Sequence, residues 1–237
     1  MTLRQVESGV YLVAEREVDK ICLELKEAIE SGDSDGASKL TAKLIELGYP
    51  PLDIINNCLI SAMNSVGDKF ARLELFLPEV MMAAEAFETS LKHVEPLISA
   101  TQREKITIGK VVIGTIQGDI HDLGKNIVAM MLRANGFEVI DLGRDVPVDL
   151  FVKKAVEANA DIIAISALMS TSLPYVKDVI KLLKEKGLRE RFIVMVGGGA
   201  VTREWAQEIG ADGYGEHFEE AVSVAKRLIA ERKKIAK

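Results

Sequence analysis

One short segment of the chain combines residue types that bind metals or move protons. The sequence GDIHDLG, residues 118–124, places a carboxylate, Asp119, two residues before His121, which is one of three histidines in 237 residues. An imidazole can ligate a metal or exchange a proton near neutral pH, and a neighbouring carboxylate can orient the ring. Three interpretations are open for His121: a loop residue that caps a helix or binds a carbonyl, a ligand in a two-metal site, or the single axial ligand of a metal held by a macrocycle.

The two-metal interpretation lacks ligands. GDIH resembles the first motif of calcineurin-like metallophosphatases, but that chemistry also needs a later Asp, an Asn-His pair and further histidines. The other histidines here are His93, in the helical half, and His217, near the C-terminus, and no Gly-Asn-His occurs. An axial ligand of a macrocycle needs only one imidazole and an orienting carboxylate, for which Asp119 is placed.

The elements that must position His121 alternate in type. From Lys110 the short β-branched runs VVIGTI, EVIDL, DIIAIS and FIVMVG are separated by helical stretches, and a weaker fifth strand is predicted at 211–214. Strict alternation predicts an α/β fold, a Rossmann-like (flavodoxin-like) doubly wound parallel sheet of five strands. Ligands bind such sheets at the carboxyl ends of the strands. GDIHDLG leaves the carboxyl end of the first strand.

The first half of the chain shows helical spacing of apolar residues and no strand signal. Breaks at 31–33, at 48–51 and near 73–74 predict a bundle of about four helices, with Pro78 in the first turn of the last one. The predicted domains are a helical bundle cap at 1–98, a polar linker at 99–109 and an α/β domain at 110–237.

Composition limits the function classes. A net charge of −6 gives no electrostatic footprint for nucleic acid, and no stretch approaches the ~20 apolar residues of a membrane helix. Neither a nucleic-acid nor a membrane partner is therefore expected. Only Cys22 and Cys58 are present, both in apolar-periodic segments, so a disulfide or a cysteine metal site is not expected and a cytoplasmic location fits.

Three motifs in order resemble the cobalamin-binding domain of the methionine-synthase type. They are Asp-x-His-x-x-Gly at 119–124, Ser-x-Leu at 166–168 and Gly-Gly at 197–198, separated by 41 and 28 residues. The segments MNSVGDKF, FLPEV and HVEP, at 63–70, 76–80 and 93–96, resemble the helical cap domain that precedes it in methionine synthase and in corrinoid proteins of methanol, methylamine and O-demethylase systems.

The resemblance implies cobalamin or a related corrinoid as cofactor, with His121 as the cobalt ligand. Asp119 would accept the other ring N–H, and Ser172 would complete a proton relay. Phe76 would shield the upper face of the corrin, although most apolar residues at helical spacing are core residues. For Ser170, helix capping remains an equal alternative. The remaining cofactor contacts implied are Gly118, Ile120, Asp122, Gly124, Ser166, Leu168, Gly197 and Gly198. Of the glycines, Gly124, Gly197 and Gly198 would clear room for the cofactor's nucleotide tail.

The function implied is a carrier of a methyl group on cobalt, without being a complete enzyme alone. Its partners would be a substrate-specific methyltransferase and an acceptor methyltransferase, with a corrinoid reductive activase as a further candidate. Methanol, methylamines, betaines and methoxylated aromatics are all possible donors, and the oligomeric state stays open. The alternative is a cobalamin-dependent sensory or regulatory module.

Overall fold

The computed structural model describes the backbone of residues 3–98 and 107–235 and the side chains of 17–98 and 107–234. The chain divides into two compact units, Met1–Ile106 and Thr107–Lys237. Most of the predicted linker, 99–106, lies outside the described residues. The predicted domain boundaries at 98 and 110 therefore stay predictions, and each unit is described by itself.

The first unit is helical. Residues that favour helix starts stand where its helices begin. The Asp33 side chain accepts a hydrogen bond from the Gly36 N–H at 2.9 Å and caps the second helix. Prolines lie in the first turns of the helices that begin at Pro51 and Leu77. Since α3, η1 and α4 follow one another without a gap, the described residues confirm about four helices. The bounds are α1 Leu3–Glu30, α2 Ser34–Glu46, α3 Pro51–Asp53, η1 Ile54–Ile60 (a π-helix), α4 Ser61–Ala71, α5 Leu77–Val94 and η2 Glu95–Leu97.

The cysteines depart from the sequence-based expectation. Cys22 on α1 and Cys58 on η1 form a disulfide, with their Cα atoms 5.2 Å apart. The prediction of no disulfide was wrong, because helical periodicity places each cysteine on an inward face but does not show that the two faces meet. The disulfide joins two helices that contact each other and that both carry buried apolar side chains, such as Leu25 on α1 and Leu59 on η1.

The second unit is a five-stranded parallel sheet in the order β2-β1-β3-β4-β5. The predicted fold is confirmed, and the last strand lies slightly later than the predicted 211–214. The bounds are β1 Lys110–Thr115, α7 Leu123–Ala134, β2 Glu138–Asp141, α8 Val148–Glu157, β3 Ile162–Ser166, η3 Ser170–Ser172, α9 Leu173–Glu185, η4 Arg189–Arg191, β4 Ile193–Gly197, α10 Arg203–Ile209, β5 Gly213–Gly215 and α11 Phe218–Ile235.

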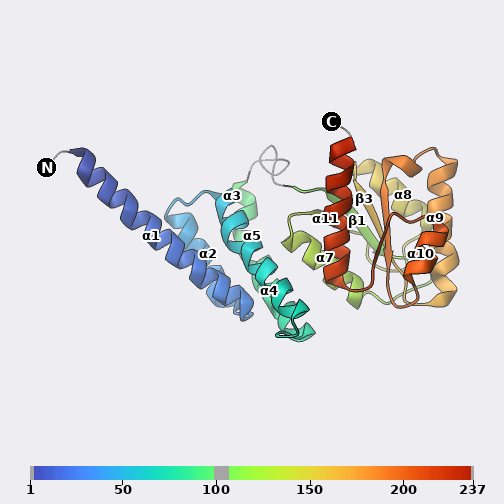
Figure 1. Ribbon diagram of the computed structural model, residues 1–237, viewed down its shortest axis with the longest axis horizontal. Coiled ribbons are helices and arrows are strands. Elements are labelled where there is room, and N and C mark those ends of the chain that lie inside the picture. The colour runs from blue at the N-terminus through green and yellow to red at the C-terminus, as the bar shows by residue number, and fades with distance from the viewer. Residues whose placement is uncertain (1–2, 99–106, 236–237) are drawn as a thin grey trace. The chain divides into compact units, whose positions relative to one another are not determined.

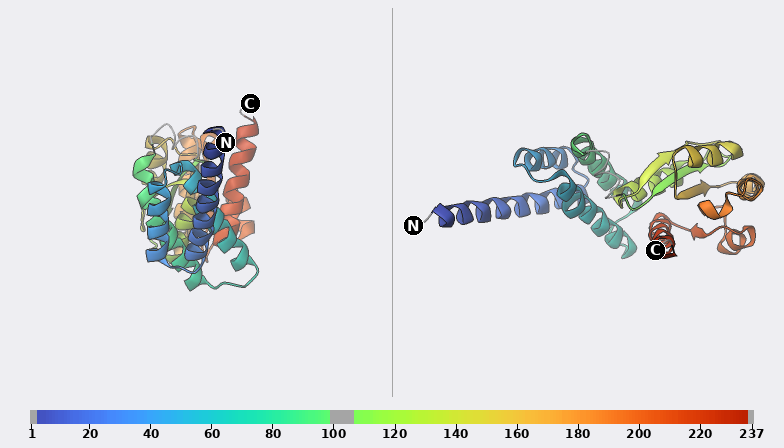
Figure 2. Two further views of the ribbon diagram at one scale, coloured as in Figure 1. Left: turned by 90° about the vertical axis from the view of Figure 1, so that its left-hand side faces the viewer. Right: turned by 90° about the horizontal axis from the view of Figure 1, so that it is seen from above.

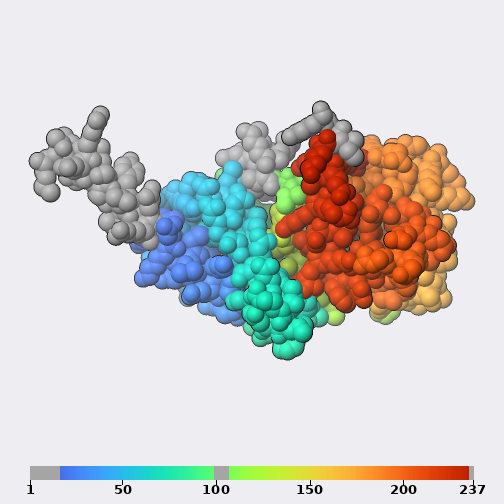
Figure 3. All heavy atoms as spheres, in the orientation of Figure 1, coloured from blue at the N-terminus to red at the C-terminus, as the bar shows by residue number. Residues whose placement is uncertain are grey.

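Helices enclose this sheet on both faces (Figures 1 and 2). α7 contacts α11, and the side chains of α11, red in Figure 3, cover part of that face of the unit. On the other face α8 and α9 pack together, and Phe151 and Val179 are buried against strand residues such as Val112 and Val194. None of the helices within the described ranges is long and apolar enough to span a membrane.

The strand order creates the position for a site. The chain leaves β1 for β2 on one side and later adds β3 on the other side of β1, so the loops after β1 and β3 diverge from adjacent strand ends. Thr115 at the end of β1 is in register with Ser166 at the end of β3, and Ser166 is in register with Gly197 at the end of β4. The three predicted motifs therefore begin at one edge of the sheet.

Candidate functional site

The loop after β1 is shaped by its backbone. The Asp119 N–H donates to the Ile116 carbonyl at 3.1 Å, and Gly118 adopts φ +81°, a left-handed conformation that favours glycine. The buried Thr115 hydroxyl donates to the His121 carbonyl at 3.0 Å. These contacts turn the chain so that Asp119 points inward and His121 stands at the carboxyl edge of the sheet.

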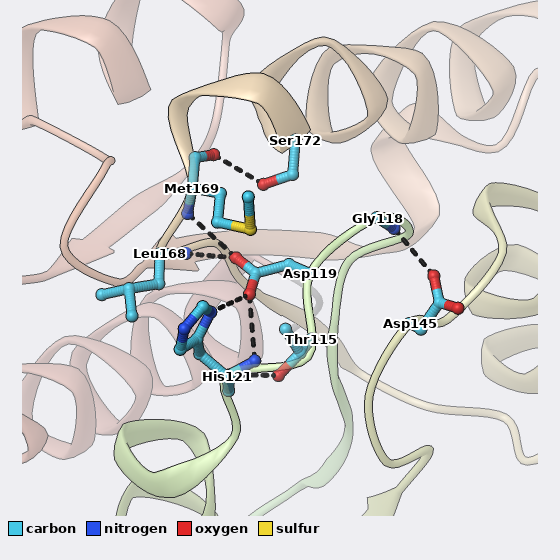
Figure 4. A network of polar contacts seen from close by, with 8 residues as sticks. All are labelled: Thr115, Gly118, Asp119, His121, Asp145, Leu168, Met169 and Ser172. Atoms are coloured by element: carbon cyan, nitrogen blue, oxygen red, sulfur yellow. Dashed lines mark hydrogen bonds and ion pairs between the residues drawn. The ribbon is translucent and has the colours of Figure 1, made fainter.

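Asp119 is the anchor of the site. Its carboxylate is fully buried, and Oδ2 accepts the backbone N–H groups of Leu168 and Met169 at 2.6 and 3.0 Å. Oδ1 accepts the backbone N–H of His121 at 3.0 Å and contacts His121 Nδ1 at 2.8 Å. One side chain thus joins the loop after β1 to the loop after β3 (Figure 4).

Hydrogen bonding keeps this carboxylate ionised. Burial alone would raise the pKa of the Asp119 carboxyl, but the hydrogen bonds from the His121 amide, the His121 ring, and the Leu168 and Met169 amides together lower it below its usual value. An ionised carboxylate only accepts hydrogen bonds, so His121 Nδ1 carries the proton in this contact.

This arrangement presents the opposite ring nitrogen of His121. The side chain is 51% exposed, and within the described part of the chain Nε2 has no hydrogen-bond partner. Because Nδ1 holds the proton, a neutral ring offers the lone pair of Nε2 to an electrophile or a metal. No cluster of three or more His, Cys, Asp or Glu side chains that could hold a metal ion occurs in the described segments.

Ser172 is brought into the same loop but not to the carboxylate. Its buried hydroxyl donates to the Met169 carbonyl at 2.7 Å, and no hydrogen bond links it to Asp119 among the described residues. Its predicted place in a proton relay stays a prediction that no direct contact supports. Ser172 is also the N-cap residue of α9, without a side-chain cap bond, so the capping alternative for Ser170 is not observed.

The predicted glycines differ in what surrounds them. A Cβ on Gly197 would lie 2.7 Å from the Gly215 carbonyl oxygen, and one on Gly198, at φ +102°, would collide with the Ala167 carbonyl oxygen. The protein's own backbone therefore requires both glycines, without any need for a cofactor tail. Gly124, in the first turn of α7, has nothing within 4 Å of the Cβ position.

The remaining predicted residues divide between the two units. Asp122 is the half-buried N-cap of α7, without a side-chain cap bond, and Ser166 ends β3 half-buried. Ser170 is exposed at the start of η3. Phe76 is the N-cap residue of α5 in the helical unit, is 67% exposed, and so is not a core residue.

Sequence reasoning missed three contacts around the site. Lys125, in the first turn of α7, has a side chain only 1% exposed and forms an ion pair with Asp141 at the end of β2, with Nζ 2.6 and 2.5 Å from the two carboxylate oxygens. The other two are the Thr115 hydroxyl bond and a hydrogen bond from the Gly118 N–H to Asp145 at 2.8 Å. A lysine directly after the Asp-x-His-x-x-Gly motif was the only available signal, and it does not reveal its partner.

The surroundings of His121 fit a large macrocycle that holds a metal. The open Cβ direction of Gly124 permits close approach to the backbone, and a single exposed imidazole suits an axial ligand. Large apolar side chains are exposed in the loops after β1 and β3 and at the start of α7, as expected for contacts with a broad apolar ring. They are Ile120, Leu123, Leu168 and Met169.

Comparisons with known proteins agree with this geometry. A family model described as a B12 binding domain matches residues 109–223, and a second of the same description matches residues 21–95. Dimethylamine corrinoid protein 1 of Methanosarcina mazei is 48% identical over 89% of this chain and 97% of its own length. Trimethylamine corrinoid protein 1 of Methanosarcina acetivorans is 42% identical over 89% of this chain and 98% of its own length.

The solved structures extend the likeness to the fold. The methanol:cobalamin methyltransferase complex MtaBC from Methanosarcina barkeri matches with a TM-score of 0.81 and 31% identity, covering 97% of this chain and 93% of that chain. The likeness thus covers both the helical unit and the α/β unit. This chain therefore belongs to the family of corrinoid proteins that contain a B12 binding domain.

Proposed function

We propose that this protein carries a methyl group on the cobalt of a bound corrinoid, from a methylamine-specific methyltransferase to an acceptor methyltransferase. The observation that carries the proposal is the His121 ring, held at Nδ1 by the buried carboxylate of Asp119 and exposed at Nε2, in a family of corrinoid proteins. The relatives named for dimethylamine and trimethylamine support a carrier over a sensory module.

A bound corrinoid supplies a cobalt centre that accepts a methyl group from one enzyme and yields it to another. In this proposal His121 Nε2 would be the protein ligand of the metal, and Asp119 would fix the direction and basicity of the ring through Nδ1–H. The exposed apolar side chains of Ile120 and Leu168 would help to hold the cofactor, and the open Cβ position of Gly124 would leave room for it.

The pair also fixes the position of one proton in this proposal. His121 Nδ1 would keep its proton against the Asp119 carboxylate, and this hydrogen bond would hold the ring with Nε2 directed away from the carboxylate. Ser172 acts by holding the Met169 carbonyl, since the adjacent Met169 N–H is one of the donors that fix Asp119. Ser172 would thus stabilise the loop, and its place in a proton relay stays a prediction.

The helical unit presents an exposed apolar surface at the start of α5, formed by Phe76 and the partly exposed Leu77 and Met81. In this proposal Phe76 would be the contribution of the helical unit to cofactor binding. The partner enzymes would select the donor, and a corrinoid reductive activase would be a further partner.

The test is methyl transfer with defined donors. Apoprotein is reconstituted with hydroxocobalamin, reduced, and mixed with dimethylamine, trimethylamine, monomethylamine or methanol together with the methyltransferase that serves each donor. We expect the absorbance change of cobalt methylation to be fastest with a methylamine and to be lost in His121→Ala. A protein that stays colourless after reconstitution would contradict the carrier function. Cobalt methylation with methanol and its methyltransferase, but with none of the methylamines, would contradict the proposal of a methylamine as donor.

A further inference from the structure

The segment between β2 and α8 is joined to the loop that carries Asp119 and His121. Asp145 Oδ1 accepts the Gly118 N–H at 2.8 Å, as Figure 4 shows. In return, the Asp145 N–H donates to the Asp119 carbonyl at 3.0 Å. These two hydrogen bonds run in opposite directions between neighbouring residues of the two loops, so they fix both the separation of the loops and their relative orientation.

Flanking strand-like contacts continue the attachment. The Thr115 N–H donates to the Gly143 carbonyl and the Val146 N–H donates to the Thr115 carbonyl, both at 3.0 Å. Among the hydrogen bonds that join these described segments, the one from the Gly118 N–H to Asp145 is the only one that uses a side chain. A change of this side chain can weaken the connection without deleting it.

The conformation of Asp145 points to a specific requirement. Its φ is +53°, in the left-handed region, where Asp and Asn are tolerated better than other non-glycine residues. The turn alone would be served at least as well by glycine. The carboxylate is used in addition, because its oxygen accepts the amide that begins the site loop.

Asp119 is consequently held from two directions. Its carboxylate is fixed by the Leu168 and Met169 amides, and its backbone carbonyl is fixed by the Asp145 N–H. A rotation of the Asp119 backbone would carry Oδ1 away from the ring nitrogen of His121. We propose that Asp145 is a positioning residue that sets the Asp119–His121 pair for metal ligation, an inference that rests on the proposed function.

The substitutions separate the hydrogen bond from the turn. Asp145→Gly keeps the left-handed conformation and removes the acceptor, whereas Asp145→Asn keeps an acceptor oxygen and removes the charge. Asn159 offers a matched control, because it also lies at a positive φ, +49°, and its side-chain oxygen accepts a hydrogen bond from Arg191 Nη2 at 2.9 Å. It precedes β3, at the opposite edge of the sheet from the site.

The first readout is the ligand field of the reconstituted, one-electron-reduced protein. We expect Asp145→Gly to weaken hydroxocobalamin binding about tenfold, the lower end of the range for outer partners of a metal ligand, and to lower the fraction of cobalt that shows histidine nitrogen coupling in its electron paramagnetic resonance spectrum. Asp145→Asn should recover most of both properties. Asn159→Gly should leave both properties unchanged.

The second readout uses the apoprotein. Solvent exchange of the Gly118 amide should be about tenfold faster in Asp145→Gly, as expected for loss of one hydrogen bond to a charged acceptor, and near wild type in Asn159→Gly. Equal affinity, spectra and exchange in Asp145→Gly and Asn159→Gly would overturn the inference, as would Asp145→Asn behaving like Asp145→Gly. Wild-type protein that binds no corrinoid would instead refute the proposed function, and amide exchange would still decide the role of Asp145.

Discussion

Replacing Gly124 with alanine should move stability and cofactor affinity in opposite directions. Gly124 lies in the first turn of α7, without a positive φ, and its Cβ position has no heavy atom within 4 Å. Alanine is a better helix former than glycine, so the apoprotein should gain about 0.5 kcal/mol in free energy of unfolding. If the corrinoid packs against this backbone, the added methyl group should cost about 1–3 kcal/mol of overpacking in the complex.

These energies define two measurements. Urea unfolding of the apoprotein, followed by circular dichroism, should show a slightly higher midpoint for Gly124→Ala than for wild type. Titration with hydroxocobalamin, followed by absorbance, should show about 5- to 150-fold weaker binding, which is the overpacking cost expressed as an equilibrium ratio.

Gly198→Ala supplies the contrast, because the protein itself occupies that Cβ position. A Cβ there would collide with the Ala167 carbonyl, and φ is +102°, so the apoprotein should be destabilised before any cofactor is added. Gly124→Ala with unchanged corrinoid affinity would refute the placement of the cofactor against α7. A destabilised Gly124→Ala apoprotein would refute the open geometry at this position.

Three further predictions follow from the described contacts. Asp119→Ala should lower the free energy of unfolding by about 2–4 kcal/mol, because buried N–H donors lose their acceptor. The pKa of this carboxyl is lowered in the folded state, so the stability that it contributes is lost as the pH falls. The urea midpoints of mutant and wild type should therefore differ fully above about pH 4 and converge below it. Asp141→Ala should lower the free energy of unfolding more than Lys125→Met does. The first variant leaves the buried Lys125 ammonium without its partner, whereas the second leaves the Asp141 carboxylate, whose side chain is 27% exposed to water. Equal urea midpoints for the two variants would contradict this prediction. Cys58→Ser should lower the free energy of unfolding of the helical unit by up to about 4 kcal/mol, given a sequence separation of 36 between the bonded cysteines. Calorimetry should show the same loss when wild type is reduced, and a thermal transition that does not respond to reductant would contradict this prediction.

The parts of the site that follow one another along the chain could be predicted from the sequence. The alternation of strands and helices placed Asp119, His121, Ser166 and Gly197 at one edge of the sheet, because parallel strands share a carboxyl edge. The pairing of His121 with Asp119 also follows from local spacing, since a two-residue separation in a tight loop brings both side chains together.

Contacts between distant segments could not be predicted in the same way. The hydrogen bonds of Asp145 and the ion pair of Lys125 depend on which strand lies beside β1, and no local pattern encodes that. The prediction of no disulfide between Cys22 and Cys58 was wrong for the same reason. Gly198 was expected to clear space for a ligand, whereas its neighbour is the backbone of the adjacent strand's loop.

The central claim is that His121 is the protein ligand of cobalt. Its most direct test is the electron paramagnetic resonance spectrum of the one-electron-reduced, reconstituted protein, prepared with natural and with ¹⁵N-labelled histidine. We predict that the nitrogen triplet becomes a doublet on labelling and that the labelled signal disappears in His121→Gln. A triplet that survives labelling would show that the ligand comes from the cofactor or another residue type, and a doublet that persists in His121→Gln would place another histidine on the metal.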